Sequence, residues 1–126
     1  MYLLDSNIVI DFLNGDKKVG DWMNKEKSTF SLFPFSISTV GRIEVLSDKR
    51  LTEKQAVELE KFLDSFDTFS ISDEIARLAA MLRREKVLSL GDAIIAATAI
   101  IRKRTLVTRD KSFAKKVNNL VEVLSI

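Results

Sequence analysis

The segment LSLGDAIIAATAIIRK, residues 88–103, carries the strongest information about the fold. From Leu90 to Lys103 it is apolar nearly all round a helical circumference, which is typical of a helix buried on most sides. The strand-like run TLVT, residues 105–108, follows directly. Similar short β-like runs alternate with longer amphipathic stretches along the rest of the chain. This alternation predicts an α/β protein with a mostly parallel sheet.

Apolar periodicity and turn residues predict the positions of the other helices and strands. We expect strands at residues 2–5, 33–38, 68–71, 105–108 and 121–124. We expect helices at residues 6–13, 17–26, 39–47, from the capping-box sequence TEKQ at 52–55 to about 66, from 72 onward, 90–103 and 111–117. The chain has 126 residues and no repeat or linker, which predicts a single domain over residues 1–126.

The composition limits the chemistry that this chain can perform. It has no cysteine and no histidine, which excludes disulfides, thiolate and imidazole metal sites, and a Ser-His-Asp triad. Carboxylates with other oxygen ligands favour Mg²⁺ or Mn²⁺. The longest uncharged apolar stretch, Ala93–Ile101, is far short of the ~20 residues that a membrane span needs. With no targeting segment visible, we expect a cytoplasmic protein without a membrane partner.

Two aspartates stand where strands are predicted to end. Asp5 ends the first strand, and Asp110 lies just beyond the strand at 105–108. The carboxyl ends of parallel strands form the ligand crevice of an open sheet, so these two carboxylates can face the same cavity. Each has a simpler interpretation as the N-cap of the helix that follows.

Two further carboxylates lie on predicted helices. Asp92 is the only charge between Lys86 and Arg102, and a buried carboxylate is costly without a cation. Its simpler role is a favourable interaction with the helix dipole, with Ser89 as the cap. Glu44 shares the helix side of Val40 and Ile43, where a glutamate needs a partner or must reach water from the edge of the core. Asp48, one turn further on, competes with Glu44 for the role of the helical carboxylate.

Several carboxylates that converge without histidine or cysteine repel one another unless divalent cations neutralise them, so the pattern favours a Mg²⁺ or Mn²⁺ site. Ser6, Asn7 and Thr108 are the expected neutral groups that orient carboxylates or water. In the opening MYLLDSNIVID, either Ser6 or Asn7 can cap the helix that runs to residue 13. That assignment leaves Asp5 free for the crevice, and Asp11 is then structural or a surface residue.

Positive charge is concentrated near the carboxyl end of the chain. Residues 102–116 hold seven basic side chains and one acid, Asp110. Such a cluster can attract a polyanion, although basic runs are often only a solvated surface.

These motifs resemble a PIN-domain ribonuclease. They are the strand ending in DSN at residues 5–7, Glu44 after the second strand, GDAIIAATA at residues 91–99, and LVTRD at residues 106–110 followed by Phe113. Size and motif order further resemble VapC-type toxins of prokaryotic toxin–antitoxin pairs. The resemblance implies a three-layer α/β/α fold with about five strands and an acidic quartet of Asp5, Glu44, Asp92 and Asp110. Many relatives have Leu where Val45 stands, and Asn where Asp110 stands.

The implied function is a Mg²⁺- or Mn²⁺-dependent endoribonuclease that hydrolyses RNA phosphodiester bonds and acts as the toxin of a type II pair. It would form a homodimer and be neutralised by a cognate antitoxin. Phe12, Trp22 and Met23 can line a groove for it between the first two helices, and the alternative is that these residues belong to the core. The residues expected to hold the RNA backbone are Arg102, Lys103, Arg104, Arg109 and Lys111.

Two other functions also fit the sequence, and a third is disfavoured. A non-catalytic PIN-like module that binds RNA or protein, and a solitary RNA-processing PIN nuclease without an antitoxin, both stay open. A phosphatase of the haloacid dehalogenase kind is disfavoured, because its second aspartate would stand at position 7, which is Asn7 here.

Overall fold

The computed structural model describes residues 1–126 and contains one five-stranded sheet with the strand order β3-β2-β1-β4-β5. All four pairings are parallel, which confirms the predicted sheet. The strands are β1 (Tyr2–Leu4), β2 (Phe35–Ser38), β3 (Asp67–Phe69), β4 (Thr105–Thr108) and β5 (Val123–Ser125).

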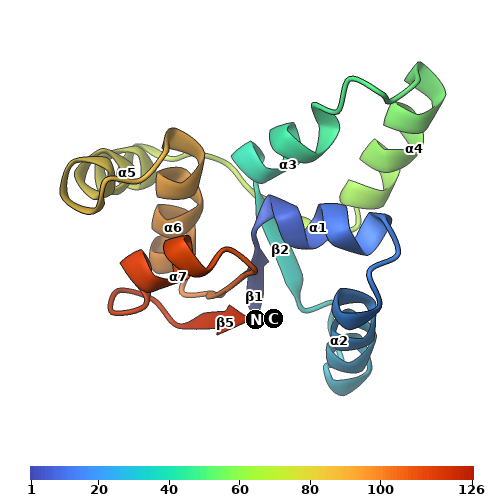
Figure 1. Ribbon diagram of the computed structural model, residues 1–126, viewed down its shortest axis with the longest axis horizontal. Helices are drawn as coiled ribbons and strands as arrows, with labels where there is room; N and C mark the ends of the chain where they lie inside the picture. The colour runs from blue at the N-terminus through green and yellow to red at the C-terminus, as the bar shows by residue number, and fades with distance from the viewer.

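Seven helices cover the sheet in two layers. Figure 1 shows α5, α6 and α7 on one side of the strands and α1 to α4 on the other. Their bounds are α1 (Ser6–Leu13), α2 (Lys17–Thr29), α3 (Thr39–Leu46), α4 (Glu53–Leu63), α5 (Asp73–Lys86), α6 (Leu90–Arg102) and α7 (Lys111–Val117). The arrangement is the expected three-layer α/β/α fold. None of the helices combines the length and the apolar character that a membrane span requires.

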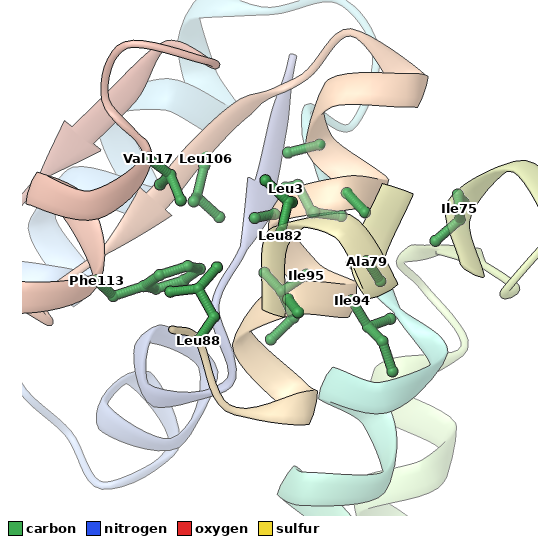
Figure 2. Close-up of a cluster of buried hydrophobic side chains, with 14 residues drawn as sticks. Leu3, Ile75, Ala79, Leu82, Leu88, Ile94, Ile95, Leu106, Phe113 and Val117 are labelled. Atoms are coloured by element: carbon green, nitrogen blue, oxygen red, sulfur yellow. The ribbon is translucent and has the colours of Figure 1, made fainter. Parts of the chain in front are cut away.

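Each face of the sheet has its own hydrophobic core, because successive strand residues point to opposite faces. Leu3 belongs to a cluster shared with α5, α6 and α7, and Leu4 belongs to a cluster shared with α1 to α4. Figure 2 shows the first cluster, where side chains from β1, β4 and these three helices meet. Seven consecutive residues of α6, Ala93–Ala99, are buried. The burial predicted for this helix is therefore confirmed.

Most elements differ from their predicted bounds by one to three residues, and β2 starts at Phe35 instead of residue 33. Specific contacts explain three of the differences. β3 covers residues 67–69 instead of 68–71, because its pairing with β2 ends at Phe69, opposite Ser38. β5 starts at Val123 instead of 121, since the amide of Val121 still bonds to Val117 in the turn after α7. α2 continues to Thr29, and the hydroxyls of Ser28 and Thr29 donate to the carbonyl of Lys25 in its last turn.

Candidate active site

Asp5 lies at the carboxyl edge of the sheet between β1 and β4. Its backbone amide donates to the Val107 carbonyl at 2.9 Å, and the residue is only 4% exposed to solvent. The Thr108 hydroxyl donates to Asp5 Oδ2 at 2.8 Å, but no basic side chain pairs with this carboxylate. Burial raises the pKa of Asp5 to about 6, the negative charges of Asp92 and Glu44 add to the rise, and the Thr108 hydrogen bond opposes it.

The predicted cap of α1 is wrong. Ser6 and Asn7 both lie inside α1, and the N-cap position is held by Asp5, whose side chain makes no capping hydrogen bond. Ser6 is buried, whereas Asn7 is exposed. The sequence DSN offers three side chains that can cap a helix, but Asp5 is instead oriented towards β4 by the Thr108 hydroxyl. The Asp5 carboxylate is thus not used to cap α1, as expected, although no other side chain caps this helix.

Asp110 is connected to Asp5 through Thr108. The Thr108 hydroxyl that donates to Asp5 also accepts from the Asp110 amide at 3.0 Å. Asp110 Oδ1 accepts from the amide of Phe113 at 3.0 Å and caps α7. The capping interpretation of Asp110 is therefore confirmed, while its second carboxylate oxygen accepts no hydrogen bond within the chain. Thr108 occupies the orienting position expected of it.

Asp92 is half-buried in the first turn of α6. Its amide donates to Ser89 Oγ at 3.2 Å, which confirms Ser89 as the cap. Burial raises the pKa of Asp92, and the negative charge of Asp110 raises it further, while the Ser89 side chain and the positive charge of Lys116 lower it. The charge of Asp92 thus acts on Asp5, and that of Asp110 acts on Asp92.

Glu44 does not lie on the apolar side of α3 as predicted. It is exposed, and the neighbouring Ile43 is 56% exposed, whereas Gly41 and Val45 form the buried side. α3 instead directs Glu44 towards α6, where a β-carbon on Gly91 would lie 3.5 Å from Glu44 Oε2. The absence of a side chain at Gly91 leaves room for this carboxylate beside the first turn of α6.

Glu44 and Asp48, the two competing helical carboxylates, differ in their side-chain partners. Arg50 donates from Nε to Asp48 Oδ1 at 3.0 Å and from a terminal nitrogen to Oδ2 at 2.9 Å. Both oxygens of Asp48 are therefore engaged by one guanidinium, which lowers the pKa of Asp48. Glu44 has no such partner, and its charge contributes to the raised pKa of Asp5.

The four carboxylates share one edge of the sheet, but their present spacing is open. No three acidic side chains are close enough together to hold a metal ion. Their chemistry nevertheless fits Mg²⁺ or Mn²⁺, because all are hard oxygen donors and none is neutralised by a salt bridge. Glu44 is exposed and has no side-chain partner, so it can change rotamer, whereas Asp5 is fixed by burial and by Thr108, and Asp110 is held by its cap of α7.

The predicted RNA-binding residues do not form one surface beside the acids. The guanidiniums of Arg102 and Arg104 lie 4.9 and 5.3 Å from the centre of the Phe69 ring. Arg102 ends α6, about 15 Å along the helix axis from Asp92. The group formed by Arg102, Lys103 and Arg104 is thus separated from the acids by most of a helix.

Arg109 was expected to contact RNA, but its guanidinium pairs instead with Asp11 and Asp16 at 3.1 and 2.8 Å. Lys111, next to Asp110 at the start of α7, is the one predicted residue that remains exposed beside the acids. Lys116 belongs to the basic cluster at residues 102–116 but was not singled out among the expected RNA-binding residues; its positive charge lowers the pKa of Asp92. Lys116, on α7, donates from Nζ to the carbonyl of Val87 after α5 at 3.2 Å. The two residues are 29 positions apart, so a local sequence pattern does not predict this contact.

A groove with equal numbers of apolar and polar lining residues adjoins Glu44, but it lies between α1 and α4 rather than between the first two helices. One hollow of about 340 Å³ includes Glu44, and a second of about 810 Å³ continues along Phe12 and Phe62. Of the three residues predicted to line a groove, Phe12 does so. Met23 lines a small neighbouring pocket, and Trp22 packs in the core against Tyr2 and Phe35.

Comparisons with known proteins agree with this architecture. A model of the PIN domain family matches residues 2–118. The chain is 28% identical to a protein in the structure of a toxin-antitoxin complex from Klebsiella pneumoniae, with a TM-score of 0.79 and coverage of 99% of this chain and 97% of that one.

Two further structures share the fold. FitAcB from Neisseria gonorrhoeae has 22% identity, a TM-score of 0.79 and coverage of 99% and 97% of the two chains. VapBC2 from Rickettsia felis, bound to a DNA fragment from its promoter, has 20% identity, a TM-score of 0.77 and coverage of 99% and 98%. No curated protein matches the chain.

Proposed function

The chain belongs to the PIN-domain family, and from this membership we propose that it is a metal-dependent endoribonuclease that acts in the cytoplasm on RNA phosphodiester bonds. The observation that carries the proposal is the buried, unpaired carboxylate of Asp5 at an edge of the sheet that also receives Glu44, Asp92 and Asp110. PIN proteins of the VapC kind are nucleases. A binding module without catalysis has no need to keep a charge buried at this cost.

The acidic group offers a binding site to a divalent metal, which PIN nucleases generally use. Asp5 and Asp92 would hold Mg²⁺ or Mn²⁺, with Glu44 completing the ligand set by rotamer change and Asp110 through the carboxylate oxygen that does not cap α7. When bound, such an ion lowers the pKa of a water molecule and offsets the charge of a phosphate.

The chain's own residues would then orient the reaction. Thr108 fixes one oxygen of Asp5 through its hydroxyl and the position of Asp110 through its accepting lone pair. The carboxylates can accept the proton of an attacking water molecule. Lys111 and Lys116, which flank the acids, would contact the phosphates on either side of the bond that is cut. Single-stranded RNA suits this open edge, because its backbone can be bent into a shallow crevice.

Removal of metal is the direct test of this function. We expect the purified chain to cut single-stranded RNA in Mg²⁺ or Mn²⁺ and to lose about 100-fold or more of that activity in EDTA, with recovery when the metal is restored. Asp92→Asn protein, purified in the same way, reports contaminating ribonuclease. Cleavage that persists in EDTA would contradict metal dependence, and RNA binding without cleavage would favour the non-catalytic module.

We further propose that the chain is the VapC-type toxin of a type II pair and that its antitoxin occupies the α1–α4 groove. A similar chain occurs in the toxin-antitoxin complex from Klebsiella pneumoniae. The apolar lining residues of the groove include Phe12, Leu59 and Phe62, and the groove extends to Glu44. An amphipathic helix fits such a groove through its apolar side, and from there it can reach the acidic edge.

Leu13 tests the groove, because it lines both hollows and is 44% exposed. We expect Leu13→Lys to weaken binding of the protein encoded immediately upstream of this gene by about 10-fold or more, since a charge replaces an apolar contact. Val57→Lys is the matched control, because Val57 is exposed on α4 but lines neither hollow. Calorimetry measures both affinities. Equal loss in the two variants would contradict docking in the groove, and the lack of any upstream partner would favour a solitary processing nuclease.

A homodimer is the assembly that we propose for the free chain. Ile71 and Leu90 are 45% and 57% exposed, and both line an apolar hollow of about 260 Å³ between α5 and α6. A second copy that covers this face would remove these side chains from water. Light scattering of the purified chain should give the mass of two chains, and the mass of one would contradict the proposal.

A further inference from the structure

Arg109 stands between the two residues that connect β4 to the acidic edge. Thr108 on one side bonds to Asp5, and Asp110 on the other caps α7. Arg109 itself contacts neither carboxylate of the acidic edge. Its side chain extends instead to α1 and to the turn between α1 and α2.

The contacts of Arg109 join elements that are remote in sequence. One terminal nitrogen donates to Asp11 Oδ2 at 3.1 Å and to Asp16 Oδ2 at 2.8 Å. The three side chains are about one-third exposed, at 30% for Arg109, 34% for Asp11 and 32% for Asp16. The pairs are therefore partly shielded from water, in contrast to the exposed pair of Lys17 and Asp21, at 88% and 66%.

Asp11 and Asp16, the two acceptors of Arg109, are connected to each other and to α2 by further hydrogen bonds. Asp16 Oδ1 accepts from the Val19 amide at 3.0 Å and caps α2, and the Asp16 amide donates to the Asp11 carbonyl at 2.9 Å. Asp11 belongs to α1, the same helix that starts directly after Asp5. Arg109 thus ties the segment that carries Thr108 and Asp110 to the helix that follows Asp5.

We propose that Arg109 is a positioning residue, which sets the separation of Asp5 and Asp110 by clamping residues 108–110 onto α1 through Asp11 and Asp16. Thr108 alone makes a single hydrogen bond to each side, and a hydroxyl can rotate. The ion pairs of Arg109 with Asp11 and Asp16 restrain the backbone between Thr108 and Asp110. The effect of this restraint on catalysis rests on the proposed function. The restraint itself does not depend on that function.

The test measures the restraint in metal-free protein by amide hydrogen exchange. In Arg109→Gln we expect exchange to accelerate about 10-fold at the amides of Asp110 and Phe113, with the amides of α6 unchanged. Asp16→Asn, which keeps a capping oxygen and removes the charge, should produce a smaller acceleration at the same two amides. Lys17→Gln breaks an ion pair on the neighbouring helix and should leave both amides unchanged.

Manganese binding without RNA is the second measurement. We expect Arg109→Gln to raise the Kd for Mn²⁺ about 10-fold and Arg109→Lys to recover part of that loss, because lysine restores the charge but not the planar geometry. Unchanged exchange at Asp110 and Phe113, or equal acceleration throughout the chain, would overturn the clamp. If wild-type protein binds no Mn²⁺, the proposed metal function fails, while the exchange measurement still decides the role of Arg109.

Discussion

Asp5→Asn is expected to lower the rate of RNA cleavage by about 10³-fold or more while the fold stays intact. Asparagine has nearly the same shape as aspartate, and its side-chain oxygen can still accept from Thr108. What disappears is the negative charge at the most buried position of the acidic edge. Without that charge a divalent cation loses the one carboxylate whose position is fixed by burial.

Asp67→Asn is the matched control for this variant. Asp67 is an exposed aspartate at the amino end of β3, so it lies at the opposite edge of the parallel sheet. Its substitution should leave cleavage within about 2-fold of the wild type, since surface changes away from a site have small effects. Initial rates on one RNA substrate, with circular dichroism as the check on folding, measure both variants. An Asp5→Asn protein that cleaves at the rate of Asp67→Asn would refute the role of Asp5.

The same substitution is expected to make the metal-free protein more stable. The pKa of Asp5 in the folded chain is about 6, against an ordinary value of 3.8, because burial disfavours the charged form. A difference of about two pKa units corresponds to about 3 kcal/mol at pH 7, where the carboxyl is ionised in both states. Asparagine does not carry this cost, so Asp5→Asn should gain that free energy of unfolding.

The pH dependence gives the sign of this effect. Below pH 3.8 the carboxyl is protonated in both states and the cost is absent; it grows as the pH rises towards about 6 and is complete above that value. The gain from Asp5→Asn should therefore be about 0.5 kcal/mol at pH 4 and about 3 kcal/mol at pH 7. Urea unfolding in EDTA at the two pH values measures it, and Asp67→Asn should show no such pH-dependent gain.

Addition of Mn²⁺ should reverse the order of stability. The ion binds the folded wild type and stabilises it by mass action, whereas the variant lacks the central carboxylate. An equal gain at pH 4 and pH 7 would contradict the proposed origin of the effect in the ionisation of Asp5. The free chain thus retains a buried charge at a cost in stability that the Thr108 hydrogen bond offsets only in part, and a bound cation would compensate the rest.

Local sequence signals were sufficient for much of the secondary structure. The bounds of α1, β4 and α7 agree with those predicted, and the capping box at Thr52 and Gln55 forms with distances of 3.1 and 3.0 Å. These features depend on residues within a few positions of one another. The ends of β3 and β5 differ, because a strand ends where its pairing partner does.

The sequence by itself determined the α/β pattern, the parallel sheet and the burial of α6, because apolar periodicity is a local property of the chain. Only the tertiary structure decided how the charged side chains are used. Arg109 meets Asp11 and Asp16 across 98 and 93 positions, and Asp48 is engaged by Arg50 while Glu44 approaches Gly91. Long charged side chains have many possible partners in a linear sequence, and packing of the two helical layers on one sheet brings a single set of them within reach.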